Sequence, residues 1–494
     1  MTKVQELDQK RIVGVVFKAL LIDLFSFTII LPLFPRLLNY YQSAEVGHQE
    51  TILGYALAVL EQFKHLIMTN PHASVKTGYA DKWDTVLLGG LIGSLFSLLQ
   101  FFVSPKIGRA SDRLGRRTVL LYTMVGNILS TLVWLFARSF SLFLVARIIA
   151  GLSEGNVQLS IAIISDVTTP EKRSRSLALV GIAFAIAFTV GPAIGAWFAS
   201  IDLSELCPSL VKFGIYPYSM AAFVGLVLLV VETAYLYVAL PETIHFRHQV
   251  EQAAAAAATS KDASTSTAAT PAGEPVTLQI IQTRLLNLQY LKQIMCAFSF
   301  LFSGMEFTLV FLTFDVLDYT HMQQGKLLGF MGIVSALIQG GYVRRRVQKM
   351  GEKMLVLQGM VSCVIGLYSL ARCVKAENPV AWLYAGVTCL AFTSGTVVNC
   401  LTSLASLQCH DRASDDALSK GRALGEFRSF GQLGRALGPI SACGLYWIFG
   451  PGACYALGAL MMVGLTWITV MNAPAGKKVD AKKPTVVKKS KKAE

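Results

Sequence analysis

Six ionisable side chains lie inside long apolar stretches of this sequence, where an unpaired charge is costly and therefore informative. Three are acids and three are bases; in chain order they are Asp23, Arg147, Glu154, Glu306, Arg428 and Arg435. A carboxylate that is shielded from water holds a proton more readily, so its protonation can compete with the binding of a solute near neutral pH. No nucleophile with an adjacent base and no metal-ligand cluster accompanies these charges, so we expect neither an enzyme nor a bound metal.

Asp23 and Glu306 are the residues that we expect to bind protons. Each is a single acid in the first apolar stretch of one half of the chain. Asp23 has a second interpretation, as a structural partner of an arginine. Glu306 has two others, as a ligand of the solute or as a polar contact between helices.

Five residues are expected to line a solute-binding site: Arg147, Glu154, Gln158, Arg428 and Arg435. The first three are spaced by seven and then four residues, which places them on one face of a helix. Arg428 and Arg435 repeat the seven-residue spacing. Arg435 is the best candidate to hold an anionic group, although it could instead be a permanent partner of Glu306 or Glu154. Glu154 could likewise be only the counter-charge of Arg147.

The composition places the chain in a membrane. Of its 494 residues, 53% are hydrophobic and 15% are charged, which is too apolar for a soluble globular protein. The net charge of +14 does not indicate nucleic-acid binding, because eight lysines and two acids after Gly476 supply +6 of it and most of the remainder lies in short loops. Nine cysteines occur without a C-x-x-C pair, and predict neither a disulfide framework nor a zinc site.

Twelve apolar stretches are long enough to cross about 30 Å of hydrocarbon as helices. They cover residues 12–37, 84–104, 117–138, 140–164, 174–200, 216–239, 290–316, 324–344, 353–372, 380–408, 420–447 and 451–472. Lysine and arginine collect in the loops on one side of these spans, so both termini are expected in the cytosol. The sequence therefore predicts an all-α polytopic membrane protein with twelve transmembrane helices.

The spans divide into two groups of six, so we expect four parts. These are an amino-terminal six-helix bundle (1–241), a low-complexity cytosolic linker (242–289), a carboxyl-terminal six-helix bundle (290–472) and a disordered basic cytosolic tail (473–494). Aligning Gly191 with Gly438 superimposes the fifth span on the eleventh, so the two bundles are expected to be pseudo-symmetric. On the outer side, residues 52–68 have the periodicity of an amphipathic helix lying on the membrane surface.

A charged hinge, Gly108 to Arg117, joins the second and third spans. Its two glycines permit a sharp turn, and its arginines mark the cytosolic side. Asp112 is expected beside the start of the eleventh span near Ser419, where a carboxylate meets unpaired backbone N–H groups and the positive end of the helix dipole. Asp112 would then hold the two halves together as a latch, and Arg116 would pair with Asp166. The alternative is that Asp112 is a solvated acid of the loop. The hinge residues to which we assign gating are Gly108, Asp112, Arg113, Gly115, Arg116 and Arg117.

Gly191, Pro192 and Gly195 form a second candidate gating element, in the fifth span. Proline removes a backbone donor, and the two glycines let another helix approach closely. The segment could seal one side against proton leak, or it could serve only ordinary helix packing.

Several motifs resemble those of the major facilitator superfamily, and within it the drug:proton antiporters related to tetracycline transporters. They are Ile22-Asp23 through Pro35, Gly108 to Arg117, Arg147 with Gly151, Asp166 to Arg175, Gly191 to Gly195, and Leu240-Pro241-Glu242-Thr243. Ser303 to Leu309 and Gln323 to Lys326 resemble the eukaryotic tetracycline-transporter-like members, which are thought to export organic anions. The carboxyl half departs from the pattern, because its counterpart of the hinge, Gly341 to Lys353, has no acid where Asp112 stands.

Together these features predict a secondary active transporter that works by alternating access. We expect it to exchange protons for a small amphipathic organic solute, an anion or a drug-like molecule, with the proton gradient as the driving force and no cofactor. Its expected partners are the solute, protons and membrane lipids, and a monomer is expected. The alternatives are an uncoupled or symporting metabolite transporter, and a membrane scaffold or receptor that uses this fold.

Overall fold

The computed structural model describes residues 3–30, 34–45, 51–68, 80–199, 215–216, 218–243, 278–319, 321–409 and 418–474, and the regular structure among them is helical. The first half contains α1 (Lys3–Thr28), α4 (Ala80–Leu114), α5 (Arg116–Leu135), α6 (Phe140–Ser153), α7 (Asn156–Val167), α8 (Pro170–Ala199) and α10 (Ser219–Ala239). The second contains α12 (Leu278–Leu317), α13 (His321–Leu337), η3 (Ile338–Val343), α14 (Arg344–Met350), α15 (Glu352–Cys373), α16 (Pro379–Gln408), α17 (Lys420–Phe449) and α18 (Pro451–Asn472).

These helices make twelve membrane spans. Nine spans within the described residues are long and apolar enough by themselves, with α6 and α7 forming one of them and α13, η3 and α14 forming another. The other three are α1, α8 and α17, which have 26, 30 and 30 residues. At 1.5 Å per residue each of them exceeds the roughly 30 Å of a hydrocarbon core. α17 falls short in hydropathy because it carries charged and polar side chains along its length.

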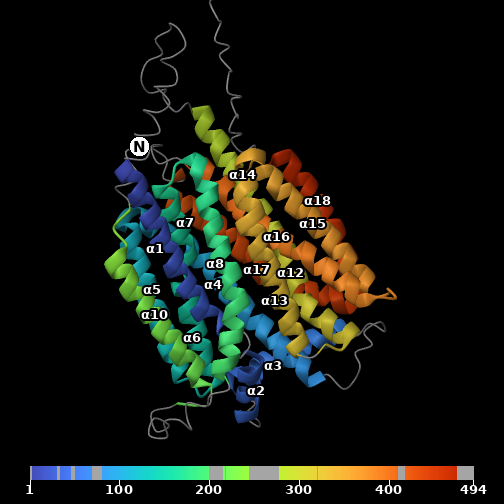
Figure 1. Ribbon diagram of the computed structural model, residues 1–494. Helices are drawn as coiled ribbons and strands as arrows, with labels where there is room; N and C mark the ends of the chain where they lie inside the picture. The colour runs from blue at the N-terminus through green and yellow to red at the C-terminus, as the bar shows by residue number, and fades with distance from the viewer. Residues whose placement is uncertain are drawn as a thin grey trace, which may run out of the picture.

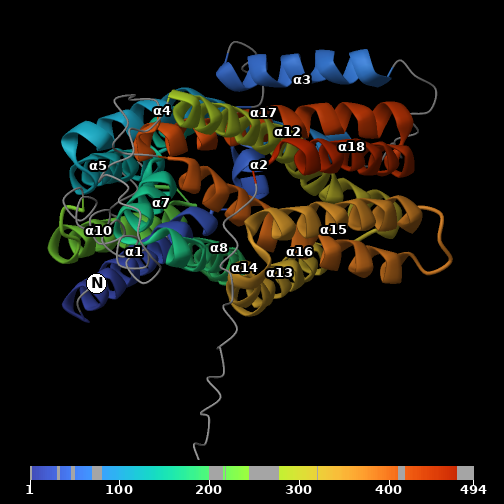
Figure 2. The same ribbon diagram turned by 90° about the horizontal axis from the view of Figure 1, so that it is seen from above.

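The spans form two bundles that lie side by side (Figures 1 and 2). In Figure 2, α1, α5 and α10 lie at one side of the molecule and α15, α16 and α18 at the other. α17 packs against α12 of its own bundle and also against α4 of the first bundle. We call the end at which α4 ends and α17 begins the latch end. Two short helices, α2 (Phe34–Ala44) and α3 (Ile52–Met68), lie at the opposite end (Figure 1), and α3 has the bounds expected for the surface helix.

The two bundles repeat a structural detail at the latch end. Gly115 has a φ of 101° and precedes α5, and Gly351 has a φ of 80° and precedes α15. Two residues after each glycine, a cation donates to a carbonyl group in the last helix of its bundle. Arg117 Nη2 lies 2.6 Å from Tyr237 O in α10, and Lys353 Nζ lies 2.8 Å from Val470 O in α18.

Two sequence expectations about boundaries need correction. The tight turn expected at 108–117 is shorter, because α4 continues through Pro105 and Gly108 to Leu114 and only Gly115 interrupts the helix. The first helix of the second half begins at Leu278, inside the range 242–289 predicted as a linker. The low-complexity run within that range, and the tail from residue 475 onward, lie outside the described residues.

Candidate functional site

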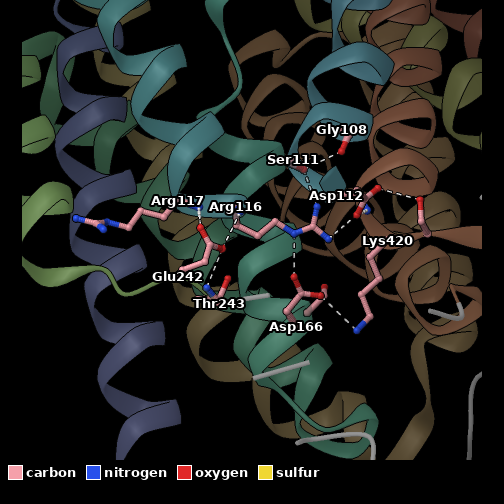
Figure 3. Close-up of polar contacts among 12 residues, drawn as sticks. Gly108, Ser111, Asp112, Arg116, Arg117, Asp166, Glu242, Thr243 and Lys420 are labelled. Atoms are coloured by element: carbon pink, nitrogen blue, oxygen red, sulfur yellow. Dashed lines mark hydrogen bonds and ion pairs between the residues drawn. The ribbon is translucent and has the colours of Figure 1, made fainter. Parts of the chain in front are cut away.

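Asp112 connects the two bundles at the latch end (Figure 3). One carboxylate oxygen accepts from the backbone N–H of Gly421 at 3.0 Å, and the other accepts from the N–H of Arg422 and the hydroxyl of Ser419, both at 2.8 Å. These N–H groups belong to the first turn of α17, which has no acceptor for them within the helix. The carboxylate therefore lies where the helix dipole favours a negative charge, as the sequence suggested.

Arg116 holds this carboxylate in place. Its guanidinium is fully buried and lies 2.8 Å from Asp112 Oδ1 and 2.9 Å from Asp166 Oδ2. Lys420, from the second bundle, lies 3.3 Å from the other oxygen of Asp166. The cluster in Figure 3 therefore alternates acids and bases across the junction of the bundles, which lowers the cost of burying the charges.

Close backbone packing accompanies these charges. A Cβ atom on Gly108 would lie 2.1 Å from the carbonyl oxygen of Gly421, so only glycine permits this approach of α4 to α17. Further along the same helix pair, Ser429 Oγ donates to Phe101 O at 2.5 Å. Between α8 and α16, Arg173 Nη1 donates to Ser406 O at 3.0 Å. The structure is thus closed between the bundles at the latch end.

Glu242 performs the same type of helix capping within the first bundle. Its two carboxylate oxygens accept from the backbone N–H groups of Arg116 at 2.9 Å and of Arg117 at 3.2 Å, at the start of α5. A Cβ on Gly115 would lie 2.5 Å from Glu242, so this turn too requires glycine. Arg117 points away from the Arg116 cluster (Figure 3), and Arg113 is exposed. The sequence motifs predict a gating role for these arginines but no separate role for Glu242.

Near the middle of the first bundle, Asp23 meets a break in the fourth span. The chain leaves α6 at Glu154, whose backbone is extended, and re-enters a helix at Asn156. The side-chain amide of Asn156 donates to Asp23 Oδ1 at 2.7 Å, and Asp23 is only 5% exposed. Broken helices at mid-membrane depth place backbone and side-chain polar groups where ions and solutes bind in many transporters.

The break shows that one geometric expectation is wrong. Arg147, Glu154 and Gln158 do not share one helical face, because α6 ends at Ser153 and α7 begins at Asn156. Arg147 lies over the rings of Phe143 and Trp134, at 5.2 and 5.8 Å from their centroids. Gln158 is buried and donates to Ser104 O at 3.0 Å. Glu154 interacts electrostatically with Asp23 of α1 and with Arg428 of α17.

A third acid, Glu232 of α10, belongs to the same group, although it is not among the six intramembrane charges identified from the sequence. It is 1% exposed and interacts electrostatically with Asp23 and Glu154. Its Oε2 atom is buried without a hydrogen-bond partner among the described residues. The signal that could have revealed it is a lone glutamate within the apolar stretch 216–239.

The second bundle contributes the basic partners. Arg428 of α17 interacts electrostatically with Asp23 and Glu154 across the junction. Arg435, two turns further along α17, interacts with Glu306 of α12. The side chain of Arg435 is exposed, although its neighbours Gly434 and Ala436 are buried.

Gly191 and Gly195 lie on the face of α8 that packs against α1. A Cβ on Gly191 would lie 1.9 Å from Thr28 Oγ1, and one on Gly195 would lie 2.3 Å from Ile29 O. The two glycines thus support close packing within the first bundle rather than between bundles. The side chain of Pro192 lies outside those that the structure describes. Over the described residues, no group of three or more potential ligand side chains has the geometry for a metal ion.

The sequence matches a family of membrane proteins and two of its mammalian members over most of its length. The family model described as Major Facilitator Superfamily matches residues 16–439. Major facilitator superfamily domain-containing protein 10 of Mus musculus is 32% identical over 474 residues, covering 94% of this chain and 94% of that protein. The Homo sapiens protein of the same name is 33% identical over 462 residues, covering 91% of this chain and 90% of that protein.

Two solved transporter structures resemble this chain along most of its length. The human organic anion transporter MFSD10 (TETRAN) has a TM-score of 0.73 and 31% identity, covering 93% of this chain and 99% of that one. The proton:xylose symporter XylE has a TM-score of 0.58 at 14% identity, which shows the fold alone. These relatives are membrane transporters and not enzymes. The chain therefore belongs to the major facilitator superfamily, as its sequence motifs predicted.

Proposed function

We propose that this transporter exchanges protons for a small amphipathic organic anion by alternating access. The observation that supports proton coupling is a group of three intramembrane acids, in which Asp23 and Glu154 interact with each other and with Arg428, and Glu232 interacts with Asp23 and Glu154. Such a group has more negative than positive charge in a medium of low dielectric constant. Proton binding neutralises the excess, so the charge of the site depends on whether it holds a proton.

Arg428 links this proton chemistry to movement of the bundles. It extends from α17 of the second bundle and interacts with Asp23 and Glu154 of the first. This attraction restrains the bundles while the site is ionised and empty. Either protonation of the acids or binding of an anion to Arg428 replaces it, so each can accompany movement of the bundles in one direction and the two movements are exchanged.

Arg435 and Glu306 extend the proposed site within the second bundle. Arg435 is exposed at mid-span, and a guanidinium binds carboxylate, sulfonate and phosphate groups through paired N–H donors. Glu306 is its electrostatic partner, and either a proton on Glu306 or an anion on Arg435 would replace this attraction. The name of the human relative, an organic anion transporter, supports this class of solute.

We propose further that the latch end faces the cytosol and that the protein works as a monomer within the lipid bilayer. The basic residues of the hinge at 108–117, of α14 and of the start of α17 lie at this end. In membrane proteins, lysine and arginine collect in the loops on the cytosolic side. The structure, closed at this end, then corresponds to a state in which the cytosol has no access to the solute site.

Reconstitution into liposomes tests the proposal. Uptake of fluorescent organic anions is measured with and without an imposed pH gradient, for the wild type, Asp23→Asn and Glu306→Gln, with the exposed Glu377→Gln as a matched control. We expect the gradient to accelerate uptake by the wild type and by the control. Under the same gradient, the uptake rate of each intramembrane variant should be about tenfold lower than that of the wild type. Anion flux that does not respond to the gradient would show an uncoupled transporter and overturn the coupling.

A further inference from the structure

A pocket of about 420 Å³ opens at the latch end, apart from the solute site and from the contact between the bundles. Asp8, Arg11 and Ile12 of α1 line one side, Arg117 of α5 lies between, and residues 237–241 at the end of α10 line the other side. We call it the Arg11–Arg117 pocket. Its volume is in the range of sites that hold small molecules or headgroups.

Two guanidinium groups give this pocket its chemistry. Arg117 points out of the Arg116 cluster toward α1 (Figure 3), where Arg11 extends from the α1 side of the pocket. Arg117 is held in place, because Nη2 donates to Tyr237 O at 2.6 Å and the guanidinium carbon lies 5.2 Å from the centroid of the Tyr237 ring. A guanidinium that is fixed in the wall of a pocket is suited to bind an oxyanion.

The charge of the lining favours a single anionic group. Arg11 and Arg117 outnumber Asp8, so the pocket has an excess of one positive charge. A phosphodiester carries one negative charge and several acceptor oxygens. Asp8 leaves an acceptor for an amino or hydroxyl group next to that phosphate.

The rim of the pocket indicates that the ligand is a lipid. Tyr237 and Val238, at the end of a membrane-spanning helix, are 65% and 85% exposed. Exposed apolar side chains beside a cationic pocket at the end of a span lie at the depth where acyl chains meet headgroups. A free anion would use the guanidinium groups but not this apolar rim.

We propose that the Arg11–Arg117 pocket binds the phosphodiester headgroup of an acidic phospholipid from the leaflet at the latch end. Arg117 directly follows Arg116, the residue that holds the latch carboxylate, so a bound lipid would contact the segment that carries the latch. The proposal does not depend on proton coupling or on the nature of the transported solute.

Native mass spectrometry of the purified full chain in mild detergent tests the proposal. The protein is titrated with phosphatidylglycerol and with phosphatidylcholine, and Arg11→Gln/Arg117→Gln is compared with Arg345→Gln/Lys353→Gln, which removes two cations at the same end of the second bundle. We expect the first variant to bind phosphatidylglycerol about tenfold more weakly and the second to remain within about twofold of the wild type. Arg11→Lys/Arg117→Lys, which keeps the charge, should lie between the wild type and the glutamine variant.

Competition identifies the source of the phosphate. Inorganic phosphate at millimolar concentration should leave phosphatidylglycerol bound, because it cannot use the apolar rim. Displacement by inorganic phosphate would show a site for a free anion and overturn the lipid assignment. Equal binding of phosphatidylglycerol by the wild type and by a monodisperse Arg11→Gln/Arg117→Gln protein would overturn the site itself.

Discussion

Replacing Asp112 by asparagine should open the junction between the bundles at the latch end. The substitution keeps the size of the side chain but removes its charge. It thereby removes the attraction to the α17 dipole, worth up to about 2 kcal/mol where a charge is partly buried. It also leaves the fully buried Arg116 with one carboxylate, Asp166, in place of two. We expect the closed state to lose about 2 kcal/mol, which is a factor of about thirty in its equilibrium with the open state.

Hydrogen exchange measures this loss where it occurs. The backbone N–H groups of Gly421 and Arg422 donate to Asp112, so their exchange reports the opening of the latch. In Asp112→Asn, the peptide covering the first turn of α17 should exchange about thirtyfold faster than in the wild type. Glu242→Gln is the matched control, because it removes the analogous cap at the start of α5 without touching α17. Unchanged protection of the α17 peptide in a monodisperse Asp112→Asn protein would refute the latch.

Substitutions at three further positions test other parts of the site. Gly108→Val places side-chain atoms where the Gly421 carbonyl lies, so it should speed hydrogen exchange at the start of α17, as Asp112→Asn does, and stop transport. Hydrogen exchange equal to that of the wild type would contradict the close approach of α4 to α17. Glu232→Gln removes one negative neighbour of Asp23, so the pH profile of anion exchange should shift to lower pH while the apparent affinity for the anion stays within about twofold. An unshifted profile would remove Glu232 from the proton-binding group. Arg435→Gln should raise the KM for organic anions about tenfold, and Arg435→Lys should raise it less; equal KM values for both variants and the wild type would show that Arg435 does not bind the solute.

The latch could be predicted from the sequence because its requirements are local. A lone acid among arginines, one turn from a glycine, has few favourable partners other than a helix start and a buried base. The structure places Asp112 at the first turn of α17 and Arg116 beside Asp166, in agreement with that reasoning. What periodicity did not show is that residues 108–114 remain helical, since glycine and charged residues resemble a loop in composition.

The interior charges were harder to predict. A seven-residue spacing implies a shared face only if the helix is continuous, and a glycine at position 155 does not by itself announce a break. The surroundings of Arg147 are also remote in sequence, because it interacts with Tyr41 and Tyr216 as well as with its neighbours on α6. Such contacts depend on how α2 and the segment before α10 pack onto the bundle, which the apolar pattern of each span does not specify.

Glu232 shows a different limit. Within residues 227–231 every side chain is apolar, and a single acid after such a run scarcely changes the mean hydropathy of the span. Its importance appears only when α10 is placed beside α1 and the break between α6 and α7, which brings its carboxylate into electrostatic contact with Asp23 and Glu154. The packing of helices within the first bundle, rather than the sequence of any one helix, creates the group of acids.

Proton movement driven by the solute is the most direct test of the central claim. Liposomes with a trapped pH-sensitive dye and equal pH on both sides receive an organic anion that the wild type transports. Exchange predicts that the interior becomes more alkaline as the anion enters, and that Asp23→Asn abolishes this change. Entry of the labelled anion into wild-type liposomes at constant internal pH would contradict proton-coupled exchange.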